Sequence, residues 1–251
     1  MGEPLLKGKV VVIGGASKNL GSLISKSLGA EGASVVVHYN SASSRAAAEE
    51  TVASVKAVGG DAFAIQGDFT KVAEIVKVFQ QAKARYGGID IAINTVGKVL
   101  KKPIADTTEE EYDDMFAVNS KAAYFFIREA ARTLNDGGKI VSIVTSLLGA
   151  FTGLYSTYEG SKAADEHFTR AAAKELGPRG ISVTAVGPGP MDTPFFYPVE
   201  TPESIAYSKA ASMNGKLTEA SDIVPIVKCL VTDGWWITGQ TILANGGYTT
   251  K

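Results

Sequence analysis

Cysteine and histidine are scarce in this chain, and their scarcity excludes several kinds of site. The 251 residues contain one cysteine, Cys229, and two histidines, His38 and His167. A disulfide framework within the chain and a cysteine-based zinc site are therefore excluded, and no pair of metal ligands at a regular spacing surrounds either histidine. We expect no metal site. Cys229 lies in an apolar helical pattern, which predicts a buried and unreactive thiol.

An excess of charge of either sign is also missing. The chain has 25 Lys and Arg against 26 Asp and Glu, a formal net charge of -1. That balance provides no electrostatic footprint for nucleic acid or for an anionic membrane surface. No apolar run approaches the roughly 18 residues of a membrane span, and the first residues lack the pattern of a signal peptide. We therefore expect a cytoplasmic protein whose partners include neither nucleic acid nor a membrane.

Apolar runs and helix-period segments alternate along a chain that is 45% hydrophobic and 20% charged, as in a globular protein. Runs that are apolar throughout predict strands covered on both faces, and strands separated by helices predict a parallel sheet. The sequence thus predicts an α/β fold, a single domain with a seven-stranded parallel sheet. The expected strands cover residues 10–13, 34–37, 61–65, 89–93, 139–144, 181–186 and 240–243, and the expected helices cover 20–28, 44–58, 72–85, 109–134, 157–176 and 219–231.

One segment, residues 188–217, breaks this alternation. It holds five prolines and the aromatic run Phe195-Phe196-Tyr197, and Thr201-Pro202 within it has the pattern of a helix start. An insertion of this length in a compact domain is usually a lid or a binding loop. We expect the segment to cover a substrate site.

Glycine is enriched, with 27 copies, and its first cluster stands where a strand meets a helix. The spacing there is Gly15-x-x-x-Asn19-x-Gly21. Glycine lets a turn approach a phosphate closely, and the helix N-terminus that follows stabilises negative charge. Asn19, in the middle position, belongs to the few other residue types that tolerate a positive φ. The turn predicts a site for a dinucleotide pyrophosphate, although a plain strand–helix turn would show similar glycines.

The end of the second expected strand bears on which dinucleotide binds. NAD sites usually place a carboxylate there for the ribose 2′-hydroxyl, whereas NADP sites avoid that charge. Here no Asp or Glu follows the strand until Glu49. Lys18 in the glycine turn supplies a positive charge, and Asn40, Ser41 and Ser43 can hydrogen-bond a phosphate. The pattern favours NADP(H), while use of NAD(H) stays open.

A second group of candidate residues comes from three further elements. Tyr158 and Lys162 are four residues apart and therefore share one helix face. Ser146 follows the fifth expected strand, at the sheet edge where open α/β folds bind ligands, and Asn119 lies in the helical stretch before that strand. The Tyr–Lys spacing alone is unspecific, but the ordered set together with the glycine turn predicts a catalytic group. The neighbouring pair Asp165-Glu166 has the pattern of a solvated helix face.

These features give the chain a resemblance to the short-chain dehydrogenase/reductase family over nearly its whole length. The resemblance implies a doubly wound Rossmann fold spanning residues 1–251. Six segments carry it in the family's order: 67–70 (GDFT), 94–97 (NTVG), 118–120 (VNS), 144–149 (VTSLLG), 188–193 (PGPMDT) and 237–247 (ITGQTILANGG). The chain departs from the family's usual residues, without losing a group needed for chemistry, at Gly14, Thr95, Val96, Thr184, Gly187 and Asn245.

The resemblance also implies how these residues act on a carbonyl group. Tyr158 would protonate the carbonyl oxygen as hydride arrives from the nicotinamide, while Lys162 would lower the pKa of Tyr158 and hold the nicotinamide ribose. Ser146 would polarise the carbonyl, and Asn119 would hold a water that relays protons to Lys162. The implied cofactor-binding residues are Gly15, Ser17, Lys18, Asn19, Leu20, Gly21, Tyr39, Asn40, Ser41, Asp68, Phe69, Asn94, Gly97, Tyr158, Lys162, Pro188, Gly189, Met191 and Thr193.

Apolar and aromatic residues flank this expected reaction centre. They predict a pocket for an uncharged or hydrophobic ketone, a small-molecule substrate covered by a mobile lid. The candidate substrate residues are Leu147, Leu148, Tyr155, Phe195 and Phe196.

Other functions stay open on the sequence. Arg128 and Arg132, on one helix face, and Lys101-Lys102 would suit the docking of an acyl carrier protein, which keeps a 3-oxoacyl-[acyl-carrier-protein] reductase as an alternative. A sugar or polyol dehydrogenase is another alternative, and a nucleotide-binding sensor without catalysis is a third. The resemblance further implies a homotetramer.

Overall fold

A computed structural model describes residues 3–250, and in them seven parallel strands form one sheet. The strands are β1 (Val10–Gly14), β2 (Ser34–Tyr39), β3 (Asp61–Gln66), β4 (Ile91–Asn94), β5 (Lys139–Ile143), β6 (Ser182–Pro188) and β7 (Thr241–Ala244). The α-helices are α1 (Asn19–Ala30), α2 (Arg45–Ala57), α3 (Val72–Tyr86), α4 (Glu109–Phe116), α5 (Ala122–Thr133), α6 (Ser156–Leu176), α7 (Pro202–Ala210) and α8 (Ala220–Val231).

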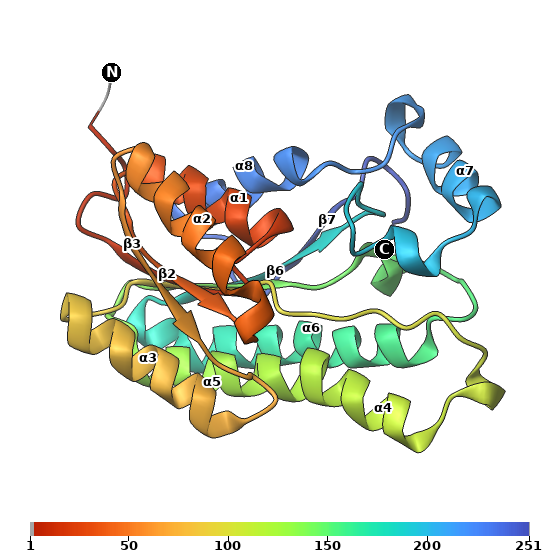
Figure 1. The fold of residues 1–251 in the computed structure, drawn as a ribbon, viewed down its shortest axis with the longest axis horizontal. Helices are drawn as coiled ribbons and strands as arrows, with labels where there is room; N and C mark the ends of the chain where they lie inside the picture. Colours follow the sequence, from red (N-terminus) through yellow and green to blue (C-terminus); the bar gives the residue numbers. More distant parts are fainter. Residues whose placement is uncertain (1–2, 251) are drawn as a thin grey trace.

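Helices cover both faces of the sheet, whose strand order is β3-β2-β1-β4-β5-β6-β7 (Figure 1). Helices α1, α2 and α8 lie on one face, and α3, α5 and α6 lie on the other. Because successive side chains of a strand point to opposite faces, β1 supplies both cores: Val11 and Ile13 pack with α1 and α8, and Val10 and Val12 pack with α3 and α5. The expected doubly wound parallel sheet is confirmed.

The helix expected over residues 109–134 is wrong in one respect, because it is interrupted. Helix α4 ends at Phe116, a π-helical turn covers Ala117–Lys121, and α5 begins at Ala122. The apolar periodicity continues through all three parts, so the sequence pattern does not reveal the wider turn. Such turns redirect side chains inside a helix and occur often at functional sites. This one carries Asn119, which is buried.

Two predictions about burial are also wrong. Cys229 is exposed, because it lies on the outer side of α8, whose opposite side buries Ile223, Val227 and Leu230. Asp165 and Glu166 are buried rather than solvated. Helix α6 packs against both β6 and α5, so it buries two sides where an ordinary surface helix buries one.

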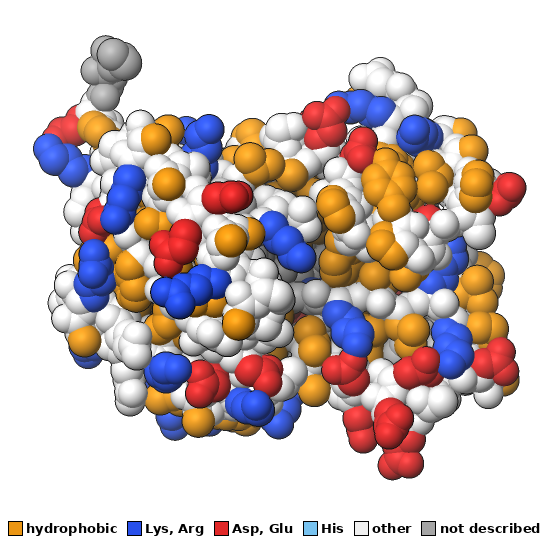
Figure 2. Space-filling view, viewed as in Figure 1, with side chains coloured by type: hydrophobic (Ala, Val, Ile, Leu, Met, Phe, Trp, Pro, Cys, Tyr) orange, Lys and Arg blue, Asp and Glu red, His pale blue; other side chains and the backbone are white. Residues whose placement is uncertain are grey.

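Residues 188–217 connect β6 to α8, and hydrogen bonds join the two ends of the segment next to each other. The Asp192 N–H donates to the Thr218 carbonyl and the Thr218 N–H donates to the Pro190 carbonyl, each at 2.9 Å. Helix α7 begins as predicted, with the Thr201 hydroxyl accepting from the Ser204 N–H at 3.2 Å. Figure 2 shows hydrophobic side chains gathered around this part of the molecule.

None of the helices in residues 3–250 combines the length and hydropathy of a membrane span. In the same residues, His, Cys, Asp and Glu side chains form no group of three that could hold a metal ion.

Candidate active site

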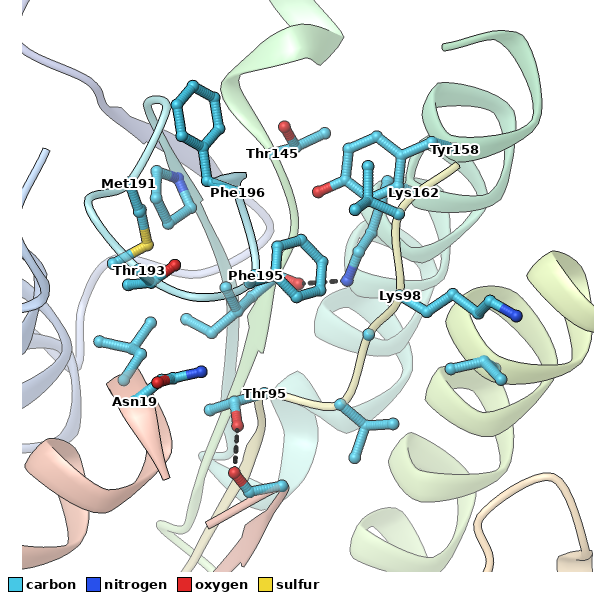
Figure 3. Close-up of a pocket in the computed structure, with 18 of the residues that line it drawn as sticks. Asn19, Thr95, Lys98, Thr145, Tyr158, Lys162, Met191, Thr193, Phe195 and Phe196 are labelled. Atoms are coloured by element: carbon cyan, nitrogen blue, oxygen red, sulfur yellow. Dashed lines mark hydrogen bonds between the residues drawn. The ribbon is translucent and has the colours of Figure 1, made fainter. Parts of the chain in front are cut away.

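A cavity of about 880 Å³ opens at the carboxyl ends of the strands. Its walls come from the loops after β1 to β6, from the start of α6 and from α7. Strands β1 and β4 are neighbours, with Gly14 beside Asn94, so the order of strands reverses between them. Open α/β sheets bind ligands at this reversal point. Figure 3 shows one end of the cavity marked by Asn19 and Thr95 and the other by Tyr158, Lys162 and the Phe195-Phe196 loop.

The glycine turn has the conformation that its spacing predicts. Gly15 has a φ of 74° and Asn19 a φ of 51°, so asparagine does take the left-handed position. A Cβ at Gly21 would lie 2.4 Å from the Gly15 carbonyl oxygen. The Thr95 hydroxyl donates to the Gly14 carbonyl at 2.7 Å, so the departure from the family at Thr95 ties the turn to β4 (Figure 3). A side chain at Gly21 would therefore force the turn itself to move, and the turn lines the cavity at the N-terminus of α1, a place that fits a dinucleotide pyrophosphate.

The buried side chain of His38 is hydrogen-bonded to this turn, a role that the sequence did not reveal. Its Nδ1 accepts from the Gly15 N–H at 3.0 Å, and its Nε2 therefore donates to the Gly67 carbonyl at 2.7 Å. Its ring stacks on Phe69 with a centroid distance of 3.6 Å. Burial lowers the pKa of His38 from its ordinary 6.5 to about 4, so the imidazole is neutral at neutral pH.

We expect the neutral His38 to make stability depend on acidity. Above pH 6.5 the histidine is neutral in both the folded and the unfolded chain. Below that pH the unfolded chain binds the proton first, so stability falls until about pH 4, by roughly 3 kcal/mol in total. Urea unfolding between pH 7 and 4 measures this loss, and His38→Asn should flatten it. Equal pH dependence in the two proteins would contradict the assignment.

The expected cofactor-binding residues line this cavity, with the exception of Asn94. The Asn94 side chain is buried at the end of β4, where its Oδ1 accepts from the Val96 N–H at 3.2 Å. It shapes the loop and does not form the cavity wall. At the end of β2 the wall consists of Tyr39, Asn40, Ser41 and Ser44, with Lys18 also on the cavity surface.

Tyr158, Lys162 and Ser146 meet at the other end of the cavity. The Lys162 Nζ donates to the Ile143 carbonyl at 2.7 Å, which directs the ammonium to the end of β5. The Ser146 hydroxyl is buried and has no hydrogen-bond partner in residues 3–250. Buried polar atoms of this kind require an explanation, and a polar ligand group provides one.

The pKa of Tyr158 differs from the expectation. Burial raises it to about 12, partly opposed by a hydrogen bond with the Thr145 hydroxyl. We expected the Lys162 ammonium to lower this pKa, but burial is the largest influence on both groups and also lowers the pKa of Lys162. Tyr158 is therefore protonated at neutral pH, as a proton donor must be.

Asn119 stands behind the cavity wall and does not line it. Its Oδ1 accepts from the Lys98 N–H at 2.8 Å, and its Nδ2 donates to the Lys98 carbonyl at 2.9 Å and to the Ser161 hydroxyl at 3.0 Å. The side chain thus joins the loop after β4 to α6. These contacts fix the Asn119 side chain close to Lys162, since a Cβ at Gly97 would lie 3.5 Å from Asn119 Oδ1 and 3.3 Å from Lys162 Nζ. The water-holding role that the resemblance implies for Asn119 stays a prediction.

Of the residues predicted to contact substrate, Leu147, Tyr155, Phe195 and Phe196 line the cavity, whereas Leu148 lies off its wall. The same cavity also holds a charged cluster of Glu200, Lys101 and Tyr155, which the sequence did not predict. The Glu200 side chain is 3% exposed, accepts from Lys101 Nζ at 2.6 Å and also accepts from the Tyr155 hydroxyl. Although burial raises the pKa of Glu200, these hydrogen bonds and that from Ser204 leave it below its ordinary value. The members are 45 to 99 residues apart, so no local pattern connects them.

The chain is similar to proteins of known sequence and structure over its whole length. A family model described as enoyl-(acyl carrier protein) reductase matches residues 15–249. The crystal structure of a putative dehydrogenase from Burkholderia cenocepacia with bound NADP is 61% identical, with a TM-score of 0.97, and the match covers 100% of this chain and 97% of that one. The short chain dehydrogenase/reductase AacuN of Aspergillus aculeatus is 35% identical over 96% of both chains. The crystal structure of the angucycline C-6 ketoreductase LanV with bound NADP is 32% identical, with a TM-score of 0.91, over 97% of this chain and 96% of that one.

Proposed function

Because the chain belongs to the short-chain dehydrogenase/reductase family, a family of oxidoreductases, we propose that it is an NADP(H)-dependent carbonyl reductase. It would interconvert a ketone and a secondary alcohol. The observation that carries the proposal is the single cavity that has the glycine turn at one end and Tyr158, Lys162 and Ser146 at the other.

The reaction needs hydride and proton to reach the two atoms of one carbonyl group. The glycine turn and Lys162 would hold NADPH, whose chemistry is the supply of hydride to a carbonyl carbon. Tyr158, protonated because burial raises its pKa to about 12, donates the proton to the carbonyl oxygen. The unpartnered Ser146 hydroxyl donates a hydrogen bond to the same oxygen and stabilises the charge that develops there. Lys162, whose Nζ donates to the Ile143 carbonyl, would place a positive charge at this end of the cavity and would bind the ribose of the cofactor.

The preference for NADP(H) rests on charge at the end of β2. No carboxylate follows β2 before Glu49 to repel a 2′-phosphate, and Lys18, Asn40 and Ser41 all line the cavity. Two of the similar solved structures contain NADP, which supports the same choice.

Lys18→Ala should weaken NADPH binding roughly tenfold and leave NADH binding unchanged, since a hydrogen bond to a charged group contributes about 1.5 kcal/mol or more. Titration of NADPH fluorescence measures the first effect, and kcat/KM with each cofactor measures the second. Lys26→Ala, a change of another exposed lysine on α1, is the matched control. Equal kcat/KM for NADPH and NADH in the wild-type protein would overturn the cofactor assignment.

A ketone fits the substrate end better than an acyl-carrier thioester does. The four basic residues that would receive the carrier are paired within the chain: Lys101 with Glu200, Lys102 with Glu111, and Arg128 and Arg132 both with Glu129. Figure 2 shows basic and acidic side chains interleaved on the face in view. The apolar wall of Leu147, Phe195 and Phe196 suits an uncharged substrate.

A panel of ketones, acyl thioesters and sugars tests this assignment by the loss of NADPH absorbance. We expect turnover of uncharged aryl or alkyl ketones, with acyl thioesters at least about tenfold slower in kcat/KM, one factor of ten being about 1.4 kcal/mol. A preference for acyl thioesters would make the protein a 3-oxoacyl-[acyl-carrier-protein] reductase. Tight NADPH binding without turnover of any member would favour a nucleotide sensor.

We also propose a cytoplasmic homotetramer, on the family resemblance. Exposed aromatic side chains on α5 and before β7, Tyr124 and Trp236, support contacts between copies there. Light scattering of the purified protein measures the assembly.

A further inference from the structure

Helix α6 buries a carboxyl group that the mechanism above does not use. Asp165 is 0% exposed, and the hydroxyls of Ser142 on β5 and Thr169 on α6 are buried beside it. Seven buried side-chain polar atoms in residues 3–250 have no well-formed hydrogen bond, and four of them belong to these three residues. Concentrating such atoms at one place costs free energy, so the cluster requires an explanation.

The cluster adjoins the residue that the mechanism needs charged. Asp165 follows Lys162 by three positions, which puts both on one face of α6. The Ser142 hydroxyl faces the carboxyl of Asp165, and the next residue, Ile143, supplies the carbonyl that accepts from Lys162 Nζ. The same helix and the same strand therefore hold both groups.

The two buried charges act on each other. Burial lowers the pKa of Lys162 and Asp165 raises it again. Burial raises the pKa of Asp165 to about 6, against the opposing effects of Lys162 and the Ser142 hydroxyl. At neutral pH the Asp165 carboxylate is thus ionised, one helical turn from Lys162.

We propose that Asp165 is a positioning residue for Lys162: from one turn further along α6, its carboxylate keeps the lysine charged and directed at the end of β5. This role of Asp165 rests on the function that we propose for Lys162 above. It accounts for a buried carboxyl where an apolar side chain would pack at lower cost.

The test measures the pH titration of Lys162 itself and does not depend on turnover. Protein labelled with ¹³C at lysine Cε is titrated by NMR, and the Lys162 signal is assigned by its loss in Lys162→Met. Asp165→Asn should lower the titration midpoint of Lys162 by about one pH unit or more, because a neighbouring opposite charge favours the charged form of a buried group. Thr169→Val changes another fully buried group on the same helix face and should leave the midpoint unchanged. An unchanged midpoint in folded Asp165→Asn would overturn the proposal.

A second variant keeps the test decisive if Asp165→Asn does not fold. In the wild-type protein the Lys162 signal should show a small inflection where Asp165 titrates. Ser142→Ala removes the hydroxyl that stabilises the carboxylate, so it should move this inflection upward in pH. A Lys162 signal with no inflection, or an inflection that Ser142→Ala does not move, would show that the two residues are not coupled. Because the readout is a chemical shift, a protein without reductase activity gives the same answer.

Discussion

Tyr158→Phe is expected to lower ketone turnover by about three orders of magnitude, since a positioned general acid contributes between a hundredfold and ten-thousandfold. The buried phenol is protonated at neutral pH, and phenylalanine retains the ring while removing the only proton assigned to the carbonyl oxygen. NADPH binding should stay within about twofold, because the glycine turn, Lys18 and Lys162 are untouched. Single-turnover kinetics and NADPH fluorescence measure the two quantities.

Tyr155→Phe provides the comparison for this prediction. Tyr155 lines the same cavity, and its ring centroid is 6.3 Å from that of Tyr158, but its hydroxyl donates to Glu200. We expect this variant to change KM more than kcat. Retention of more than about a tenth of the wild-type kcat by Tyr158→Phe would remove tyrosine from the catalytic role.

Gly21→Ala is expected to reduce NADPH affinity about a hundredfold, the loss of two charge-assisted hydrogen bonds. The added Cβ would stand 2.4 Å from the Gly15 carbonyl oxygen and 2.9 Å from the Thr95 hydroxyl oxygen. Since the first neighbour is backbone, the turn itself must move, and its N–H groups no longer converge on the pyrophosphate. Overpacking of this kind also costs about 1–3 kcal/mol of stability.

Gly177→Ala is the control for Gly21→Ala, because it replaces a glycine that has free space around it. Gly177 follows α6, and a Cβ there meets nothing within 4 Å. We expect wild-type NADPH affinity and unfolding midpoint for that variant. If Gly21→Ala bound NADPH as tightly as Gly177→Ala does, the turn would not be the pyrophosphate site.

Sequence patterns over a few neighbouring residues predicted the strands, the glycine turn and the helix face of Tyr158 and Lys162. Apolar β-branched runs gave the seven strands, because such side chains fit a sheet buried on both faces. The turn from Gly15 to Gly21 was predictable because few residues accept a positive φ, and Asn19 is one of them. Tyr158 and Lys162 were recognisable because a spacing of four residues places side chains on one helix face.

The errors arose where a side chain meets a segment distant in sequence. The helix expected over residues 109–134 is interrupted by a π-helical turn, where Asn119 contacts Lys98 and Ser161. Asp165 was expected in solvent, because its pattern on α6 looks polar until β5 covers it.

The sequence by itself determined the succession of strands and helices along the chain, the conformation of the turn from Gly15 to Gly21 and the placing of Tyr158 and Lys162 on one helix face, since each depends on residues that are close along the chain. Only the tertiary structure decided which charges are buried together. Glu200 meets Lys101 across 99 residues, and His38 meets Gly15 across 23. The free energy of burying such groups depends on how far water is excluded around them, and this exclusion depends on packing between segments that are distant in the sequence.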